Sequence, residues 1–169
     1  MNMDLQPAYL EDELVKLVPL TETDFSILFE VASDPLIWEQ HPEQDRWKRA
    51  VFEKFFRTAI DSRGAFLIID NRNGEVAGSS RFYEFDPENR SVKIGYTFIA
   101  RKFWGGSFNL SLKKLMIDHA FRFVDVIYFD IGVRNIRSRK AVEKLGATEV
   151  DHPDPEKCTY ALKKEIWGV

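Results

Sequence analysis

The sequence predicts a single α/β domain built around one mixed sheet. Its 169 residues suit one domain with a real core, and 14 phenylalanines with four tryptophans supply bulky core material. β-prone apolar runs alternate with segments whose apolar residues recur at helical spacing. Their order is strand, two helices, three strands, helix, strand, helix and two strands, and no interdomain linker interrupts it. This order predicts about seven strands flanked by about four helices.

The strand predictions rest on β-branched, aromatic and alternating apolar residues between turn residues. Asn71-Arg72-Asn73-Gly74 is typical of a hairpin turn, and Asp86-Pro87-Glu88-Asn89 is a second turn. Residues 1–13 are polar and expected to be loosely held, so the domain proper covers residues 14–169. The predicted strands are Leu14–Leu20, Phe66–Asp70, Glu75–Phe85, Val92–Ala100, Asp125–Val133, Thr148–Val150 and Cys158–Trp167.

The helix predictions rest on apolar residues that repeat every three or four positions. Thr21 and Asp24 resemble a capping box, which starts a helix that stops before Pro35. A second helix covers about Arg46–Ser62, after an aromatic and acidic connection over Leu36–Asp45. The other two predicted helices are Ser107–Phe123 and Asn135–Ala147.

Composition excludes several classes of protein and site. The net charge is −3 without a basic cluster, which argues against a nucleic-acid surface. The single cysteine, Cys158, excludes an internal disulfide and fits a reducing compartment. No apolar run approaches membrane-spanning length, and the acidic N-terminal segment is not typical of a secretory signal. We therefore expect a cytoplasmic protein with no nucleic-acid partner, no membrane partner and no metal, since no Cys/His grouping has metal-ligand spacing.

One stretch, Ile94–Phe123, organises the functional prediction. A β-prone run ends in a basic, glycine-bearing turn, and a helix with a buried face follows. The residues around that helix start are Gly105, Gly106, Ser107 and Asn109. Amides at a helix start point outward and attract anions, and glycine lets a phosphate approach the backbone. An ordinary turn is the alternative, and the spacing fits neither the phosphate loop of nucleotide hydrolases nor the dinucleotide fingerprint.

A second motif follows the next predicted strand and reads N-I-R-S-R-K-A-V-E-K-L-G-A over residues 135–147. Together with W-G-G-S-F at residues 104–108, it makes the sequence resemble the GNAT acyltransferases, which use acetyl-coenzyme A. That family carries a W-G-x-G-Y-type turn and an N-x-x-S-x-x-x-x-E-K-x-G motif, and the likeness is greatest to the branch that includes ribosomal-protein N-terminal acetyltransferases. The resemblance covers nearly the whole chain. The residues that match the second motif are Asn135, Ser138, Glu143, Lys144 and Gly146.

The resemblance implies a mostly antiparallel sheet whose fourth and fifth strands part, so that coenzyme A enters between them. Here these strands are Val92–Ala100 and Val126–Val133. It also implies that the pantetheine arm pairs with the edge of the fourth strand, where a backbone N–H serves the oxyanion. Asn135 is expected to cap its helix and contact the coenzyme arm, and Arg101 and Lys102 either hold phosphates or are solvated turn residues. The cofactor-binding residues expected are Phe98, Ile99, Ala100, Trp104, Gly105, Gly106, Ser107, Phe108, Asn109 and Asn135.

The resemblance leaves the catalytic groups partly open. Val142 occupies the position where many relatives carry a tyrosine that protonates the leaving thiolate, so that step cannot be transferred to this chain. Ser138 is the candidate that replaces it, although it also fits an ordinary helix start. Many relatives place a glutamate where Lys93 stands. Glu84, expected in a desolvated pocket, is therefore the preferred general base. The other candidates are Asp130, Glu39 and His41.

These features predict an N-acetyltransferase that passes an acetyl group from acetyl-CoA to a primary amine, on a protein N-terminus or a small molecule, by direct attack. The alternative is a non-catalytic acyl-CoA-binding module that acts through a protein partner, which the missing tyrosine and the displaced base favour. The acidic residues Glu39, Asp45 and Glu84 weakly favour a cationic acceptor. A homodimer is compatible with the sequence.

Overall fold

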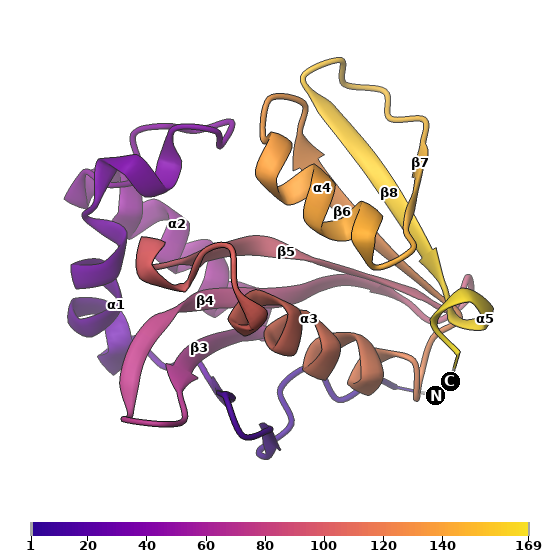
Figure 1. The fold of residues 1–169 in the computed structure, drawn as a ribbon, viewed down its shortest axis with the longest axis horizontal. Coiled ribbons are helices and arrows are strands. Elements are labelled where there is room, and N and C mark those ends of the chain that lie inside the picture. The colour runs from indigo at the N-terminus through magenta and orange to yellow at the C-terminus, as the bar shows by residue number, and fades with distance from the viewer. Residues whose placement is uncertain (1, 169) are drawn as a thin grey trace.

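The computed structural model describes residues 2–168, which form one eight-stranded sheet with helices on both faces (Figure 1). The spatial order of the strands is β1-β2-β3-β4-β5-β6-β8-β7. The strands are β1 (Leu10–Glu11), β2 (Val15–Pro19), β3 (Ala65–Asp70), β4 (Glu75–Asp86), β5 (Ser91–Ile99), β6 (Val126–Gly132), β7 (Thr148–Val150) and β8 (Lys157–Lys163).

The sheet is mixed and mostly antiparallel, which confirms the predicted fold class. Every neighbouring pair of strands is antiparallel except β5 and β6. All seven predicted strands are present, and the two-residue β1 adds an eighth that the sequence did not predict. The prediction that the last strand reaches Trp167 was wrong. The N–H of Lys164 donates to the carbonyl of Asp125 (2.9 Å), and from Lys164 the chain forms a short helix.

Residues 2–168 also form five α-helices and three 3-10 turns, which lie between the strands except for α5, the helix after the last strand that the sequence did not predict. The capping box is confirmed, because the N–H of Thr21 donates to Asp24 Oδ2 at 2.8 Å, although the first turn is 3-10 rather than α. None of the helices within residues 2–168 has the length and apolar character needed to cross a bilayer. The helices are α1 (Phe25–Ala32), α2 (Arg49–Ser62), α3 (Ser107–Ala120), α4 (Ile136–Lys144) and α5 (Lys164–Trp167), and the turns are η1 (Glu22–Asp24), η2 (Pro35–Trp38) and η3 (Arg101–Phe103).

The two faces of the sheet bury separate cores. On one face, α3 contributes Phe108 and Met116 to a large apolar cluster. On the other face, Phe52 and Phe55 of α2 stack on each other and contact Phe98 of β5. Each such side chain stabilises the fold by about 1.5–3 kcal/mol when fully buried. Strand β5 is thus held firmly from both faces.

Strands β5 and β6 pair over three residues each and then part. The parallel pairing covers residues 91–93 of β5 and 126–128 of β6, and Figure 1 shows the two strands diverging beyond it. A bulge in β5 accompanies the parting: Tyr96 has a φ of 53°, and the pairing of β4 with β5 shifts register beside it. Bulges bend and twist the strand that carries them. The predicted parting of the fourth and fifth strands is confirmed.

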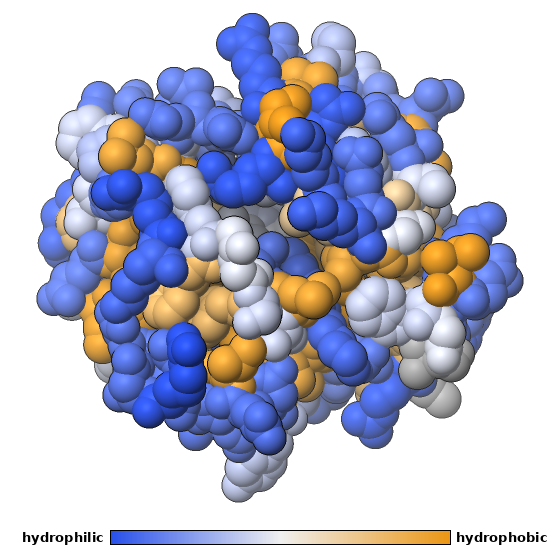
Figure 2. All heavy atoms as spheres, in the orientation of Figure 1, coloured by the Kyte–Doolittle hydropathy of each residue, from blue (hydrophilic) through white to orange (hydrophobic). Residues whose placement is uncertain are grey.

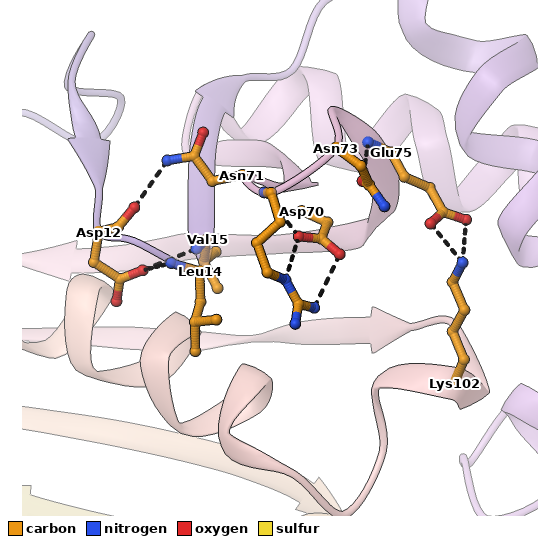
Figure 3. A network of polar contacts seen from close by, with 9 residues as sticks. Asp12, Leu14, Val15, Asp70, Asn71, Asn73, Glu75 and Lys102 are labelled. Carbon is orange, nitrogen blue, oxygen red and sulfur yellow. Dashed lines mark hydrogen bonds and ion pairs between the residues drawn. The ribbon is translucent and has the colours of Figure 1, made fainter.

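The segment before β2 lies against the domain. Strand β1 pairs with β2, and Gln6 Nε2 donates to a backbone carbonyl at the start of β3 (2.8 Å). Asp12 accepts the N–H groups of Leu14 and Val15, as Figure 3 shows. These contacts do not measure how much the segment moves. That residues 1–13 are loosely held therefore stays a prediction.

Candidate active site

The parting of β5 and β6 opens a cleft of about 820 Å³, within the range of small-molecule sites. Both strands, the turn before α3, the start of α4 and the connection from η2 to α2 line it. Figure 2 shows a hollow on this face whose rim is mostly hydrophilic. Seven lysine and arginine residues line the cleft against two carboxylates, although the chain carries a net charge of −3. The positive charge of the molecule is thus concentrated where an anion could bind.

The edge of β5 that faces the cleft offers backbone groups at Ile99. The N–H of Ala100 donates to the carbonyl of Ala77 on the β4 side (2.8 Å). Because N–H groups alternate in direction along a strand, the Ile99 N–H faces the opposite side, where β6 has moved away. Trp104 Nε1 donates to the Ile99 carbonyl on that side (3.1 Å). The structure argues against Ala100 as the oxyanion donor and favours Ile99, because the Ala100 N–H is already bonded and Ala100 does not line the cleft.

The turn between β5 and α3 is open toward the cleft. Gly105 has a φ of 73°, a conformation that favours glycine. A Cβ added to Gly105 or Gly106 would meet no atom within 4 Å. Within residues 2–168, no side chain caps the first turn of α3. Free amides at a helix start, beside open space, form a suitable site for phosphate.

Two predicted residues of this turn do not line the cleft. Phe108 is buried and stacks on Phe103, with ring centroids 4.3 Å apart, so its side chain belongs to the core. Ser107 begins α3 at the surface. Any contact of these two residues with a ligand would involve their backbone amides rather than the side chains.

Neither Arg101 nor Lys102 points its charge at the cleft. Arg101 pairs with Asp34, and Lys102 pairs with Glu75 at the start of β4 (Figure 3). Neither residue lines the cleft. They are surface ion pairs, which agrees with the alternative that they do not hold phosphates.

The start of α4 forms the opposite wall. Asn135 is buried, and its Oδ1 accepts the N–H of Ser138 at 3.3 Å, so the predicted cap is confirmed. Ser138 and Val142 line the cleft together with Asn135. The guanidinium of Arg137 lies 3.6 Å from the ring centroid of Trp104, across the cleft.

A buried lysine, which the sequence analysis missed, lies between α3 and β5. Lys113 is 7% exposed and lines the cleft, and its Nζ donates to Thr97 Oγ1 at 2.9 Å. Thr97 Oγ1 lies in turn 2.8 Å from the hydroxyl of the fully buried Ser80. Burial lowers the pKa of Lys113 to about 8. Helical spacing in the sequence could have indicated this position. Lys113 lies four residues after Asn109 and four before Ile117, so the three residues share one face of α3.

The two carboxylates of the cleft share one lysine. Lys93 Nζ lies 2.8 Å from Asp130 Oδ2 and also pairs with Glu84. The Glu84 side chain is 62% exposed, so the desolvated pocket expected for it was wrong. Burial alone would raise the pKa of Asp130, but hydrogen bonds from Lys93 and Thr159 outweigh it and lower that pKa. A carboxylate with a lowered pKa is a weak general base.

The connection from η2 to α2 closes over the far part of the cleft. Gln40 Oε1 accepts the N–H of Arg137 at 3.2 Å, and Pro42 packs so closely on Gly132 that a Cβ there would lie 2.6 Å from its ring. His41 and Arg46 line the cleft from this connection. Burial and the charges of Arg46 and Arg137 lower the pKa of His41 to about 3, so its imidazole is neutral near pH 7.

Nine of the twelve predicted site residues line this cleft, and three do not. Local residue spacing could not predict that Arg46 lines the cleft, because this depends on how the connection from η2 to α2 folds back over β6. The predicted residues that line the cleft are Glu84, Phe98, Ile99, Trp104, Gly105, Gly106, Asn109, Asn135 and Ser138. Those that do not are Ala100, Ser107 and Phe108.

Residues 15–148 match the family described as the acetyltransferase (GNAT) domain. The chain belongs to the GNAT acetyltransferase family. Members of this family transfer acetyl groups from acetyl-CoA, and the cleft of this GNAT chain has the glycine-bearing helix start and the free strand edge that such a ligand needs. The branch with ribosomal-protein N-terminal acetyltransferases stays a prediction.

Solved structures of other acetyltransferases share the fold. A GCN5-related N-acetyltransferase from Brucella melitensis is 21% identical with a TM-score of 0.78, and the match covers 94% of this chain and 80% of that one. A GNAT-family acetyltransferase from Bacillus anthracis is 15% identical with a TM-score of 0.76, covering 93% and 99%. An acetyltransferase from Agrobacterium tumefaciens str. C58 is 18% identical with a TM-score of 0.71, covering 97% and 99%. At these identities the likeness concerns the fold and not the acceptor.

Proposed function

We propose that this acetyltransferase passes the acetyl group of acetyl-CoA to the nitrogen of a primary amine by direct attack, without an acyl-enzyme. The observation that carries the proposal is the cleft at the parting of β5 and β6, which combines a free backbone edge with an uncapped helix start. Its two parts have different roles. We call the part formed by Ile99, Trp104, Gly105, Gly106, Asn109 and the start of α4 the coenzyme half, and the part formed by Ile37, His41, Pro42, Arg46 and Tyr96 the acceptor half.

The coenzyme half suits a long, amide-rich and phosphorylated ligand. The N–H groups around Gly106 would hold the phosphates, with Lys140 and Lys144 of α4 as further cations that line the cleft. The Ile99 edge would pair with the pantetheine arm as an added strand does. Asn135 is held rigidly by its own cap bond, so its amide is preorganised for the same arm.

Acetyl-CoA supplies an acyl group activated as a thioester. The Ile99 N–H would stabilise the negative charge that develops on the carbonyl oxygen during attack. The incoming amine must be neutral, and neither Glu84 nor Asp130 is arranged as a strong base, so we assign its deprotonation to solvent in the cleft. Ser138 would give a proton, directly or through water, to the leaving thiolate.

A non-catalytic acyl-CoA-binding module is the second candidate. Two observations favour it: both carboxylates of the cleft pair with Lys93, and Val142 offers no hydroxyl. The test is to incubate the protein with acetyl-CoA and a panel of primary amines, to follow free thiol, and to identify the N-acetyl product by mass spectrometry. An enzyme releases thiol only when an amine is present. A binding module gains thermal stability with acetyl-CoA and releases no thiol with any amine.

A further inference from the structure

The acceptor half contains a guanidinium without an acidic partner at hydrogen-bond distance. Arg46 lines the cleft, and its side chain is only 14% exposed. Its Nε is buried and makes no hydrogen bond, and the nearest carboxylate oxygen, on Glu43, lies 3.7 Å away. Buried N–H donors normally have a hydrogen-bond acceptor, because leaving one without a partner costs free energy.

Aromatic rings fix this guanidinium in place. Its Cζ lies 4.8 Å from the ring centroid of Phe55 and 5.6 Å from that of Trp38, and Trp38 is fully buried. These contacts restrict the side chain before any ligand arrives. A planar donor fork held rigidly beside apolar walls is the arrangement that recognises a carboxylate.

The charges around Arg46 point to the same class of ligand. Glu39 and Asp45, which in the sequence favoured a cationic acceptor, do not line the cleft, and Glu84 pairs with Lys93. Glu43, whose carboxylate lies 3.7 Å from Arg46 Nε, is 56% exposed and does not line the cleft either. No carboxylate of the acceptor half is therefore left to hold a second positive charge. A dicationic amine would meet unfavourable charge there, whereas an amine that also carries a carboxylate would meet a guanidinium that has no carboxylate at hydrogen-bond distance.

The connection that carries Arg46 packs against α4 and β6. Gln40 and Pro42 bridge from the η2–α2 connection to α4 and β6, so the acceptor half is roofed by the chain itself. The single positive charge of Arg46 matches the single negative charge of one carboxylate. The covered acceptor half suits a small molecule better than a polypeptide. We propose that the acceptor is a small primary amine that bears a carboxylate, and that Arg46 binds that carboxylate. This inference rests on the proposed acetyl transfer for its turnover assay, but not for its binding assay.

The experiment compares the standard L-amino acids and β-alanine with their carboxamides as acceptors, at saturating acetyl-CoA, with thiol release as the readout. We expect at least one acid to react with a kcat/KM about 10–100-fold above its carboxamide, because a charge-assisted bidentate contact is lost in the amide. Arg46→Gln should remove this preference by raising KM for the acid while leaving the carboxamide unchanged. Arg46→Lys should restore part of it.

Arg57→Gln is the matched control. Arg57 lies on α2, is 61% exposed and pairs with Glu22 away from the cleft, so this variant should keep the full preference. The inference is overturned if carboxamides, or peptides with a free N-terminus, react better than every acid. It is also overturned if the preference survives in a folded Arg46→Gln protein, which would leave Arg46 with a packing role on Trp38 and Phe55 alone.

A binding measurement separates this inference from the proposed function. If no amine is acetylated, the acids are titrated by calorimetry into the protein loaded with coenzyme A. Binding of an acid that is lost in Arg46→Gln and kept in Arg57→Gln supports the carboxylate site, even though acetyl transfer has failed. Absence of binding by every acid overturns the site, whatever the outcome of the turnover assay.

Discussion

The coenzyme half of the cleft is built mainly from backbone, whereas the acceptor half is built from side chains that come from distant parts of the chain. In the coenzyme half, the groups proposed to bind acetyl-CoA are the N–H of Ile99 and the amides around Gly106, all within one strand–turn–helix segment. In the acceptor half, a connection far back in the chain brings Arg46 and His41 to β5 and β6. It precedes β5 by about 50 residues, as the numbering of Arg46 and Tyr96 shows, and it precedes β6 by still more.

This difference predicts how each half responds to substitution. A backbone site depends on glycine, on strand direction and on the helix start, and it tolerates side-chain exchange. A side-chain site depends on particular charges held by packing, such as Arg46 on Phe55. Variants in the two halves should therefore fail differently: the coenzyme half through acetyl-CoA affinity, and the acceptor half through discrimination among amines.

The largest expected effect is in the coenzyme half. Gly106→Val should weaken acetyl-CoA binding about 100-fold or more, since two charge-assisted bonds to phosphate would be blocked. The fold should survive, because Gly106 has a φ of −117°, which valine adopts, and its Cβ would meet no atom within 4 Å. Gly106→Pro should also abolish binding, by removing the N–H. Calorimetry with a melting curve measures both properties.

Lys102→Ala is the control for this variant, because Lys102 is in the same connection but pairs with Glu75 outside the cleft. It should keep acetyl-CoA affinity within about threefold, as expected for an exposed ion pair. A folded Gly106→Val protein with the wild-type affinity would place the phosphates elsewhere.

The next effect concerns Lys113, which borders both halves. Because burial lowers its pKa from 10.5 to about 8, the unfolded chain binds more protons than the folded one between these values, and its contribution to stability rises with pH in that window. Below pH 8 the buried charge is a cost. Lys113→Met should therefore raise the free energy of unfolding by about 3 kcal/mol at pH 7 and flatten the rise between pH 8 and 10.

Denaturant unfolding from pH 6 to 10 checks this expectation without ligand. Lys114→Met is the matched control, since Lys114 is 64% exposed and pairs with Asp118 on the surface of α3. It should reproduce the wild-type pH profile. A Lys113→Met protein with the same profile as Lys114→Met would contradict the buried charge.

The smallest effect is expected at Ser138. Ser138→Ala should lower kcat about tenfold, since a hydroxyl is a weak general acid, and leave the affinity for acetyl-CoA unchanged. Stability should change little, because the side chain that caps α4 is Asn135 and not Ser138. Asn135→Ala should instead lose about 1 kcal/mol of stability together with acetyl-CoA affinity. Steady-state kinetics of a Ser138→Ala enzyme with full kcat would exclude the thiolate role.

The sequence predicted the coenzyme half far better than the acceptor half, for physical reasons. The order of the elements along the chain and the cap at Asn135 follow from local patterns, because hydrophobic spacing and capping residues act within a few positions. The parting of the strands was expected from the resemblance to the GNAT acyltransferases. The environment of Glu84 was predicted wrongly, since the bulge at Glu84 (φ of 49°) leaves its side chain exposed beside Lys93. Arg46 was not predicted, because its role depends on packing between segments that no local pattern relates.

The central claim is that the free edge of β5 and the start of α3 bind acetyl-CoA through backbone amides. Amide hydrogen exchange followed by NMR, with and without acetyl-CoA, tests it most directly. The Ile99 and Gly106 amides should exchange more slowly in the complex, while the Ala100 amide, already bonded to Ala77, should change little. Binding of acetyl-CoA, seen by calorimetry, without slower exchange at Ile99 and Gly106 would contradict the account.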